Sequence, residues 1–142
     1  MATLVFRPRR ALLMASVLSG VLVAAALLGW VTLPANIQAL FTVPQLLTLA
    51  FFVAVMIAIM MSVGLSYLKA DASGLDFRNG LRRHHLDWEQ VQGLRFTEND
   101  PWAYALLAED VQRPLLGIQR TDREAAEADF ERLVAAWRQA RR

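Results

Sequence analysis

The stretch ALLMASVLSGVLVAAALLGWVTLPANIQALFTVPQLLTLAFFVAVMIAIMMSVGLSYL (residues 11–68) contains no Asp, Glu, Lys, Arg or His in 58 positions. All 13 acidic residues of the 142-residue chain follow it. A charge-free run of this length excludes a single soluble globular domain, a disordered chain and a basic nucleic-acid-binding protein. The chain also has no cysteine, which excludes disulfides, zinc–thiolate sites and cysteine catalysis.

Two segments of this run are each long enough to cross a bilayer as a helix. A hydrocarbon core of about 30 Å needs about 20 helical residues, and residues 11–33 and 45–68 each exceed that length. Pro34 and Pro44 mark the ends, because proline cannot continue the hydrogen bonds of the preceding turn. We predict a transmembrane helical hairpin with a short external loop at 34–44. The alternative, a cleaved signal peptide, would have an apolar stretch of only about 7–15 residues.

The positive charges predict the orientation of this hairpin. Residues 1–10 form a basic N-terminal segment that contains Arg7, Arg9 and Arg10. Basic residues, beginning with Lys69, also follow the second helix, whereas the connection at 34–44 carries no charge. Because positive charges stay on the cytoplasmic side, we expect a multi-pass protein of the cytoplasmic membrane with both termini in the cytoplasm.

Small residues recur every fourth position along both predicted helices. Such stripes let helix backbones approach closely in lipid, so they predict a packing seam within the hairpin, which could also join two copies of the chain. An alanine-rich chain can produce the same rows by chance. No charged side chain lies inside either helix, which argues against a transporter. The predicted seam consists of Ser16, Gly20, Ala24, Ala50, Ala54, Ala58 and Ser62.

Residues 69–142 are expected to form a small cytoplasmic domain that begins with short strands. Asn79-Gly80 is a strong β-hairpin signal, because both residues accept positive φ. Pairing Arg78 with Leu81 across this turn sets the register. The core face would then be formed by Leu75, Phe77, Leu86 and Trp88. Further strands are predicted at residues 67–71, 91–97, 102–109 and 114–119.

The end of the chain changes to a helical period. Thr121 and Glu124 fit a capping box, and apolar residues follow at helical spacing over residues 122–139. Phe130, Leu133 and Trp137 lie on the apolar face of this helix. We predict an antiparallel β-sheet or barrel closed by one C-terminal helix.

Four segments together resemble a known family. They are ADASGLDFRNGLRR (70–83), LDWEQV (86–91), PLLGIQ (114–119) and the helix headed by Asp122. In this order, after two membrane helices, they resemble the small actinobacterial pleckstrin-homology (PH) membrane proteins, a family named after a low-molecular-weight protein antigen. Trp137 is similar to the helix tryptophan that plugs the barrel of PH domains. The resemblance implies a PH-like barrel at a membrane and no established reaction.

The basic residues around Asn79-Gly80 are the main candidates for ligand binding. Arg78, Arg82 and Arg83 could bind anionic lipid head groups, since each basic residue near an anionic leaflet contributes about 1 kcal/mol. Side chains alternate along a strand, however, so Arg82 should point away from Arg83. The alternative is a solvated surface that serves only membrane topology.

No catalytic, metal or cofactor site is expected. His84 and His85 should lie on opposite faces of a strand, and a catalytic zinc ion needs at least three protein ligands. The chain lacks a Gly-x-Ser-x-Gly motif and a glycine-rich phosphate loop. Residues 102–108 are apolar on both faces, so the C-terminal helix covers one face or a partner docks there.

These observations predict a membrane-anchored, non-catalytic interaction or scaffold protein. Its partner would be a protein of the membrane or cytosol, with no role for nucleic acid. The alternatives are an anionic-lipid reader acting through Arg78, Arg82 and Arg83, and an accessory subunit that assembles through its helix seam.

Overall fold

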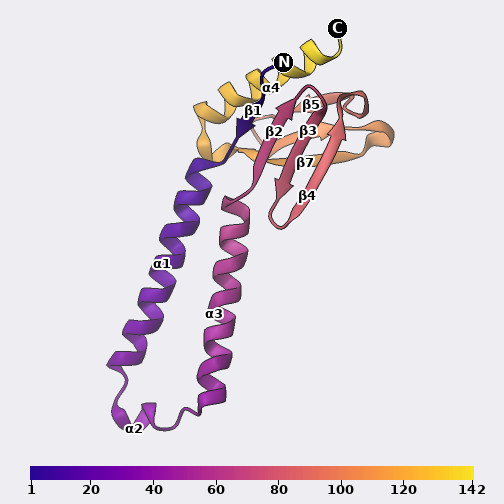
Figure 1. The fold of residues 1–142 in the computed structure, drawn as a ribbon. Coiled ribbons are helices and arrows are strands. Elements are labelled where there is room, and N and C mark those ends of the chain that lie inside the picture. The colour runs from indigo at the N-terminus through magenta and orange to yellow at the C-terminus, as the bar shows by residue number, and fades with distance from the viewer.

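The computed structural model describes all 142 residues and has two parts, a pair of long helices and a β-rich domain at one end of that pair (Figure 1). The long helices are α1 (Arg9–Thr32) and α3 (Val43–Gly64), and the short helix α2 (Ala35–Gln38) lies in their connection. Both chain termini lie at the domain end of the molecule (Figure 1).

The two long helices are apolar and almost wholly uncovered by the rest of the chain. Each is long and apolar enough to cross a membrane. The core helix of a soluble protein would instead be mostly buried. Helix α3 begins at Val43 instead of the expected Gln45, because the Thr42 hydroxyl accepts the Gln45 N–H and the Gln45 side chain accepts the Thr42 N–H. Pro44 fits this first turn because its missing N–H would have no helical partner there.

The domain contains two antiparallel sheets. The first has the order β1 (Leu4–Phe6), β2 (Tyr67–Asp71), β3 (Gly74–Asn79) and β4 (Arg82–Asp87). The second has the order β5 (Gly93–Arg95), β6 (Trp102–Leu106) and β7 (Gln112–Gln119). Helix α4 (Glu124–Ala140) ends the chain and lies near β1 (Figure 1).

Part of the predicted basic segment at residues 1–10 belongs to this domain. Strand β1 pairs with β2, and Phe6 lies opposite Leu68. Both side chains are buried in the core. The domain therefore includes a strand that precedes both long helices in the sequence.

The two sheets pack together but do not close into the expected barrel. Strand β7 crosses β2 so closely that a Cβ atom at Gly117 would lie 2.5 Å from the Leu68 nitrogen. The Asn79 side chain bridges the sheets, because its Nδ2 donates to the Pro114 carbonyl (2.6 Å) and its Oδ1 accepts the Leu116 N–H (3.2 Å). Side-chain hydrogen bonds and close packing thus replace a continuous strand ladder.

The β3–β4 register differs from the predicted one by two residues. Arg78 lies opposite Arg83, and Asn79 lies opposite Arg82, so Gly80 and Leu81 form the turn. Asn79 stays in the strand because its side chain is hydrogen-bonded to Pro114 and Leu116 of β7. A shift of two residues leaves every side chain on its predicted face.

The buried core combines residues from both sheets and α4. It includes Leu75, Phe77, Leu86, Trp88 and Leu133, while Phe130 and Trp137 pack against it and are partly exposed. The indole nitrogens donate to backbone carbonyls, that of Trp88 to Asp71 (2.7 Å) and that of Trp137 to Val91 (3.0 Å).

Helix α4 begins at Glu124 without the capping box expected from Thr121. Arg123 precedes it with φ 52° and ψ −122°, which turns the chain sharply into the helix. The Asp122 carboxylate instead accepts the backbone N–H of Arg10 at 2.9 Å. The start of α4 is therefore tied to the first turn of α1.

The contact between α1 and α3 includes small residues that the predicted seam did not contain. The helices approach closely at Gly64, where a Cβ atom would lie 2.8 Å from Leu12 Cα, and the buried small residues of α1 are Ala15 and Ser19. Gly20 has nothing within 4 Å of a Cβ position. The predicted seam residues Ser16, Gly20, Ala24, Ala50, Ala54 and Ala58 are exposed, and Ser62 is half-buried. Ala50 and Ala54 nevertheless line an apolar groove between α1 and α3, and the Ser16 Oγ lies 3.9 Å from the Met61 Sδ, so part of the predicted stripe faces the other helix.

Candidate functional site

The turn of the β3–β4 hairpin is fixed beside the last turn of α3. The Gly80 N–H donates to the buried Ser66 Oγ at 3.1 Å, and a Cβ at Gly80 would lie 3.6 Å from Ser62 Oγ. Leu81 at the tip is 82% exposed. An apolar side chain therefore projects beside the end of a candidate membrane helix.

The three arginines predicted to bind lipid do not form one site. Arg78 and Arg83 lie directly opposite each other on one face of the first sheet, and strand alternation places Arg82 on the other face. The Arg78 Nε donates to the Gly80 carbonyl at 2.7 Å. This bond leaves the two terminal nitrogens of Arg78 available for other partners.

Arg78 instead joins the N-terminal arginines in what we term the helix-mouth cavity. This cavity of about 340 Å³ lies where α1 and α3 enter the domain. Sequence reasoning missed it because Arg7 and Arg9 reach Arg78 only through β1, whose three residues are too few for a clear strand pattern. The lining residues are Arg7, Pro8, Arg9, Leu12, Gly64, Leu65, Ser66, Tyr67 and Arg78.

A neighbouring cavity of about 430 Å³ shares two of these arginines but contains acidic groups. Asp122 accepts the Arg10 N–H, and Asp129 pairs with Arg132 at 3.2 Å. Acidic side chains therefore offset much of the positive charge on that side. The lining residues are Val5, Arg7, Arg9, Arg10, Asp122, Ala125, Asp129 and Arg132.

His85 lies between two carboxylates on the exposed face of the first sheet. Its Nδ1 is 2.6 Å from Asp76 and its Nε2 is 3.2 Å from Asp87. The hydrogen bond to Asp76, followed by that to Asp87, raises the pKa of His85 above its usual value. His84 instead stacks on Phe77 with ring centroids 5.1 Å apart. No group of three or more ligating side chains is placed to hold a metal ion.

Two further carboxylates stabilise turns of the domain. Asp71 accepts the Ser73 hydroxyl (2.6 Å) and amide (2.9 Å) and pairs with Lys69, and these contacts hold the pKa of Asp71 well below its usual range. Asp100 accepts the Thr97 amide and hydroxyl, which lowers its pKa in the same way. The shifts at Asp71 and Asp100 thus reflect turn formation.

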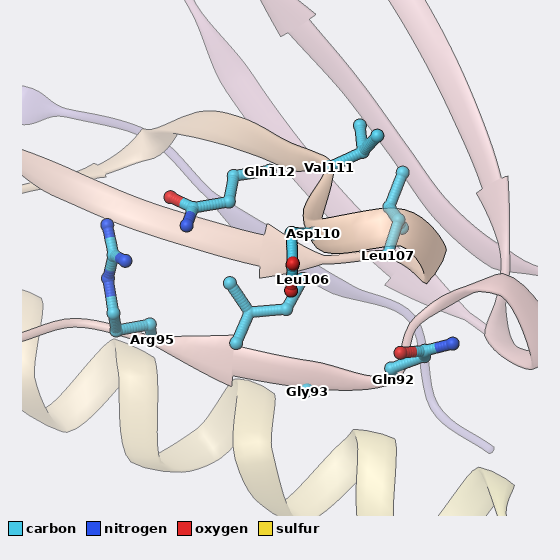
Figure 2. Close-up of a pocket in the computed structure, with 8 residues that line it drawn as sticks. All are labelled: Gln92, Gly93, Arg95, Leu106, Leu107, Asp110, Val111 and Gln112. Atoms are coloured by element: carbon cyan, nitrogen blue, oxygen red, sulfur yellow. The ribbon is translucent and has the colours of Figure 1, made fainter.

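A polar pocket of about 350 Å³ lies on the second sheet (Figure 2). Arg95 and Gln112 lie at one end and Gln92 at the other, with Leu106 between them (Figure 2). Arg95 already pairs with Asp100 at 3.3 Å and its guanidinium lies 4.7 Å from the centre of the Tyr104 ring. The pocket offers amide donors and acceptors suited to recognition and no nucleophile–base pair.

The apolar strand β6 uses its two faces differently. Ala103 and Ala105 are fully buried, whereas Trp102, Tyr104 and Leu106 are partly exposed. Arg95 covers the Tyr104 ring. The outward face of β6 is therefore only partly covered by the chain itself.

Comparison with known proteins identifies the domain. A family model described as the bacterial PH domain matches residues 66–136, which is half of the chain and runs from the start of β2 into α4. Comparisons with curated proteins and with solved structures found no match. Two packed antiparallel sheets followed by a C-terminal helix agree with this match, and the chain belongs to the bacterial PH domain family.

Proposed function

We propose that this chain is a membrane-anchored, non-catalytic interaction module. Helices α1 and α3 cross the cytoplasmic membrane, and the PH domain stands at its inner face, where it docks a protein partner. The arginines at the domain end and the uncharged connection at the other end support an orientation with both termini in the cytoplasm.

The observation that carries this proposal is the fixed attachment of the domain to the helices. β1 leads directly into α1 and α3 leads directly into β2, with two residues in each connection. The Gly80–Ser66 hydrogen bond and the Arg10–Asp122 hydrogen bond add two further ties. A domain held at four points keeps one orientation to the bilayer, which suits the presentation of a binding surface.

The surface most suited to a protein partner is the polar pocket on the second sheet. Strand β5 pairs only with β6, so its outer edge has free backbone groups that can add a peptide strand. Gln92, directly before β5, lines the pocket beside that edge, and Gln112 lines it from β7 on the other side of β6. Both amides can donate to and accept from peptide groups. An edge beside an amide-lined pocket supports peptide docking better than catalysis.

Membrane fractionation and site-specific photo-cross-linking test the proposal. The full chain should remain with membranes after alkaline carbonate extraction, and its release would contradict the anchoring. A photo-reactive residue in place of Gln112 should give a discrete protein adduct in intact cells. The control replaces Arg138, an exposed residue on α4. The same adducts from both positions, or none from Gln112, would contradict docking at this pocket.

Anionic-lipid contact through the β3–β4 tip is a second candidate function. The docking of Gly80 on α3 favours it, because the adjacent Arg82 and Arg83 then stand near the bilayer surface. Replacing both arginines by alanine should reduce binding to anionic liposomes at low salt. Unchanged binding by this double variant would eliminate the candidate.

A further inference from the structure

The helix-mouth cavity has a basic part and an apolar part. Arg7, Arg9 and Arg78 supply three guanidinium groups, while Leu12 and Leu65 supply apolar surface beside the helix ends. An anionic membrane lipid also has two parts, a negatively charged head group and the apolar acyl chains next to it. Its charged part would match the arginines of the cavity and its apolar part would match the leucines. The cavity volume of about 340 Å³ can hold part of one such molecule.

No carboxylate is paired with the arginines of this cavity, although Asp122 and Asp129 line the neighbouring cavity that shares Arg7 and Arg9. No acidic residue is among its lining residues. None of the three arginines has a carboxylate oxygen within 4 Å, whereas Arg132 in the neighbouring cavity is paired with Asp129. Three arginines without a carboxylate partner that line one cavity favour an anionic ligand, and the planar fork of a guanidinium suits phosphate oxygens.

We propose that the helix-mouth cavity binds the phosphate of an anionic membrane lipid. Arg7, Arg9 and Arg78 hold the phosphate oxygens, and Leu12 and Leu65 contact the glycerol and the first acyl carbons. The inference rests on the proposed membrane anchoring and is independent of the protein partner. Two of its three arginines lie outside the segment that matches the PH family.

The position of the cavity favours a lipid over free phosphate. It lies between the ends of two helices whose apolar side chains are exposed along their length. Basic pockets between membrane helices on the cytoplasmic side are typical head-group sites. Free phosphate would gain nothing from Leu12 and Leu65.

Spin-labelled lipids in reconstituted vesicles provide the test. The full chain is placed in phosphatidylcholine vesicles that contain a minor fraction of phosphatidylglycerol, and the motionally restricted share of each labelled lipid is measured. The wild-type protein should restrict a larger share of the labelled phosphatidylglycerol than of the labelled phosphatidylcholine. Each arginine is worth about a fivefold change in binding constant at one site. The double variant Arg9→Gln/Arg78→Gln should therefore restrict phosphatidylglycerol and phosphatidylcholine to nearly the same extent.

The controls separate this site from general surface charge and from misfolding. Arg138→Gln/Arg142→Gln removes the same charge at the far end of α4 and should leave the preference unchanged. Arg9→Gln alone changes an exposed side chain and should give a partial loss, even if the double variant folds poorly.

Three results of this experiment would contradict the proposed lipid site or the anchoring on which it rests. Equal restriction of both lipids by wild type, or equal loss in the control variant, would overturn the cavity assignment. Release of restricted phosphatidylglycerol by millimolar inorganic phosphate at constant ionic strength would assign the site to free phosphate and overturn the lipid. Absence of any restricted lipid would instead contradict the membrane anchoring.

Discussion

His85 couples domain stability to pH through the carboxylates of Asp76 and Asp87. Its pKa is raised in the folded state, so its stabilising contribution is complete below the unfolded value of about 6.5 and is lost as the pH rises through the folded pKa. We expect the melting temperature of the wild-type domain to fall over this range. His85→Gln should flatten that dependence.

The control for this measurement is His84→Gln, which leaves the Asp76–His85 contact in place. It should lower stability through the lost stacking on Phe77 but keep the pH trend. If His85→Gln and wild type show parallel melting curves from about pH 5.5 to about pH 9, the coupling is absent.

Gly64 and Gly20 test which small residues hold the helices together. Gly64→Ala would place a Cβ 2.8 Å from Leu12 Cα, an overpacking that costs about 1–3 kcal/mol. Gly20→Ala meets nothing within 4 Å and should gain about 0.5–1 kcal/mol from helix propensity. Denaturant unfolding of the full chain in mild detergent compares the two. Equal destabilisation by both changes would place Gly20 in the helix contact, as the predicted seam requires.

At the scale of elements, the β3–β4 hairpin is the part of the domain expected to touch the bilayer. Its tip is bonded to Ser66 at the end of α3, and Leu81 is exposed there. An exposed leucine beside Arg82 and Arg83 has the pattern of a side chain that enters the interface while its neighbours contact head groups.

The absence of cysteine makes this expectation easy to measure. A spin label on Leu81→Cys should be protected from a water-soluble nickel reagent and accessible to oxygen in vesicles. The matched label on Gln90→Cys, three residues beyond the other end of β4, should show the reverse. Equal nickel accessibility at the two positions would place the tip in water.

At the scale of the whole molecule, β1 makes the domain dependent on the chain before the helices. Phe6→Ala empties a buried position opposite Leu68 and should cost about 3–5 kcal/mol of domain stability. Val5→Ala is the control, because Val5 is 51% exposed on the other face of the strand. Differential scanning calorimetry of the full chain measures the stability of the domain in both variants.

A fragment that starts at residue 66 provides a second check on this dependence. It contains the whole matched segment but lacks β1, so it should melt at a lower temperature than the domain in the full chain. A fragment as stable as the full-chain domain would show that β1 only covers the sheet without stabilising it.

The sequence alone determined the two apolar helices and most of the PH-like domain. A charge-free run of bilayer length permits few structures, and the Asn79-Gly80 signal, the alternation around Leu75 and Phe77, and the spacing of Phe130 and Leu133 are local patterns. Such patterns report periodicity, which depends only on neighbouring residues. The even shift of the β3–β4 register left the predicted core face unchanged for the same reason.

Only the tertiary structure decided which distant residues meet. Residues 4–6 are too few to show a strand pattern, and they become a strand because β2 offers an open edge and the core a site for Phe6. That pairing carries Arg7 and Arg9 to Arg78, more than 60 positions away in the sequence. The packing of α1 on α3 likewise buries Ala15, Ser19 and Gly64, which the spacing of small residues did not identify. Each of these outcomes depends on packing between segments, which local periodicity does not encode.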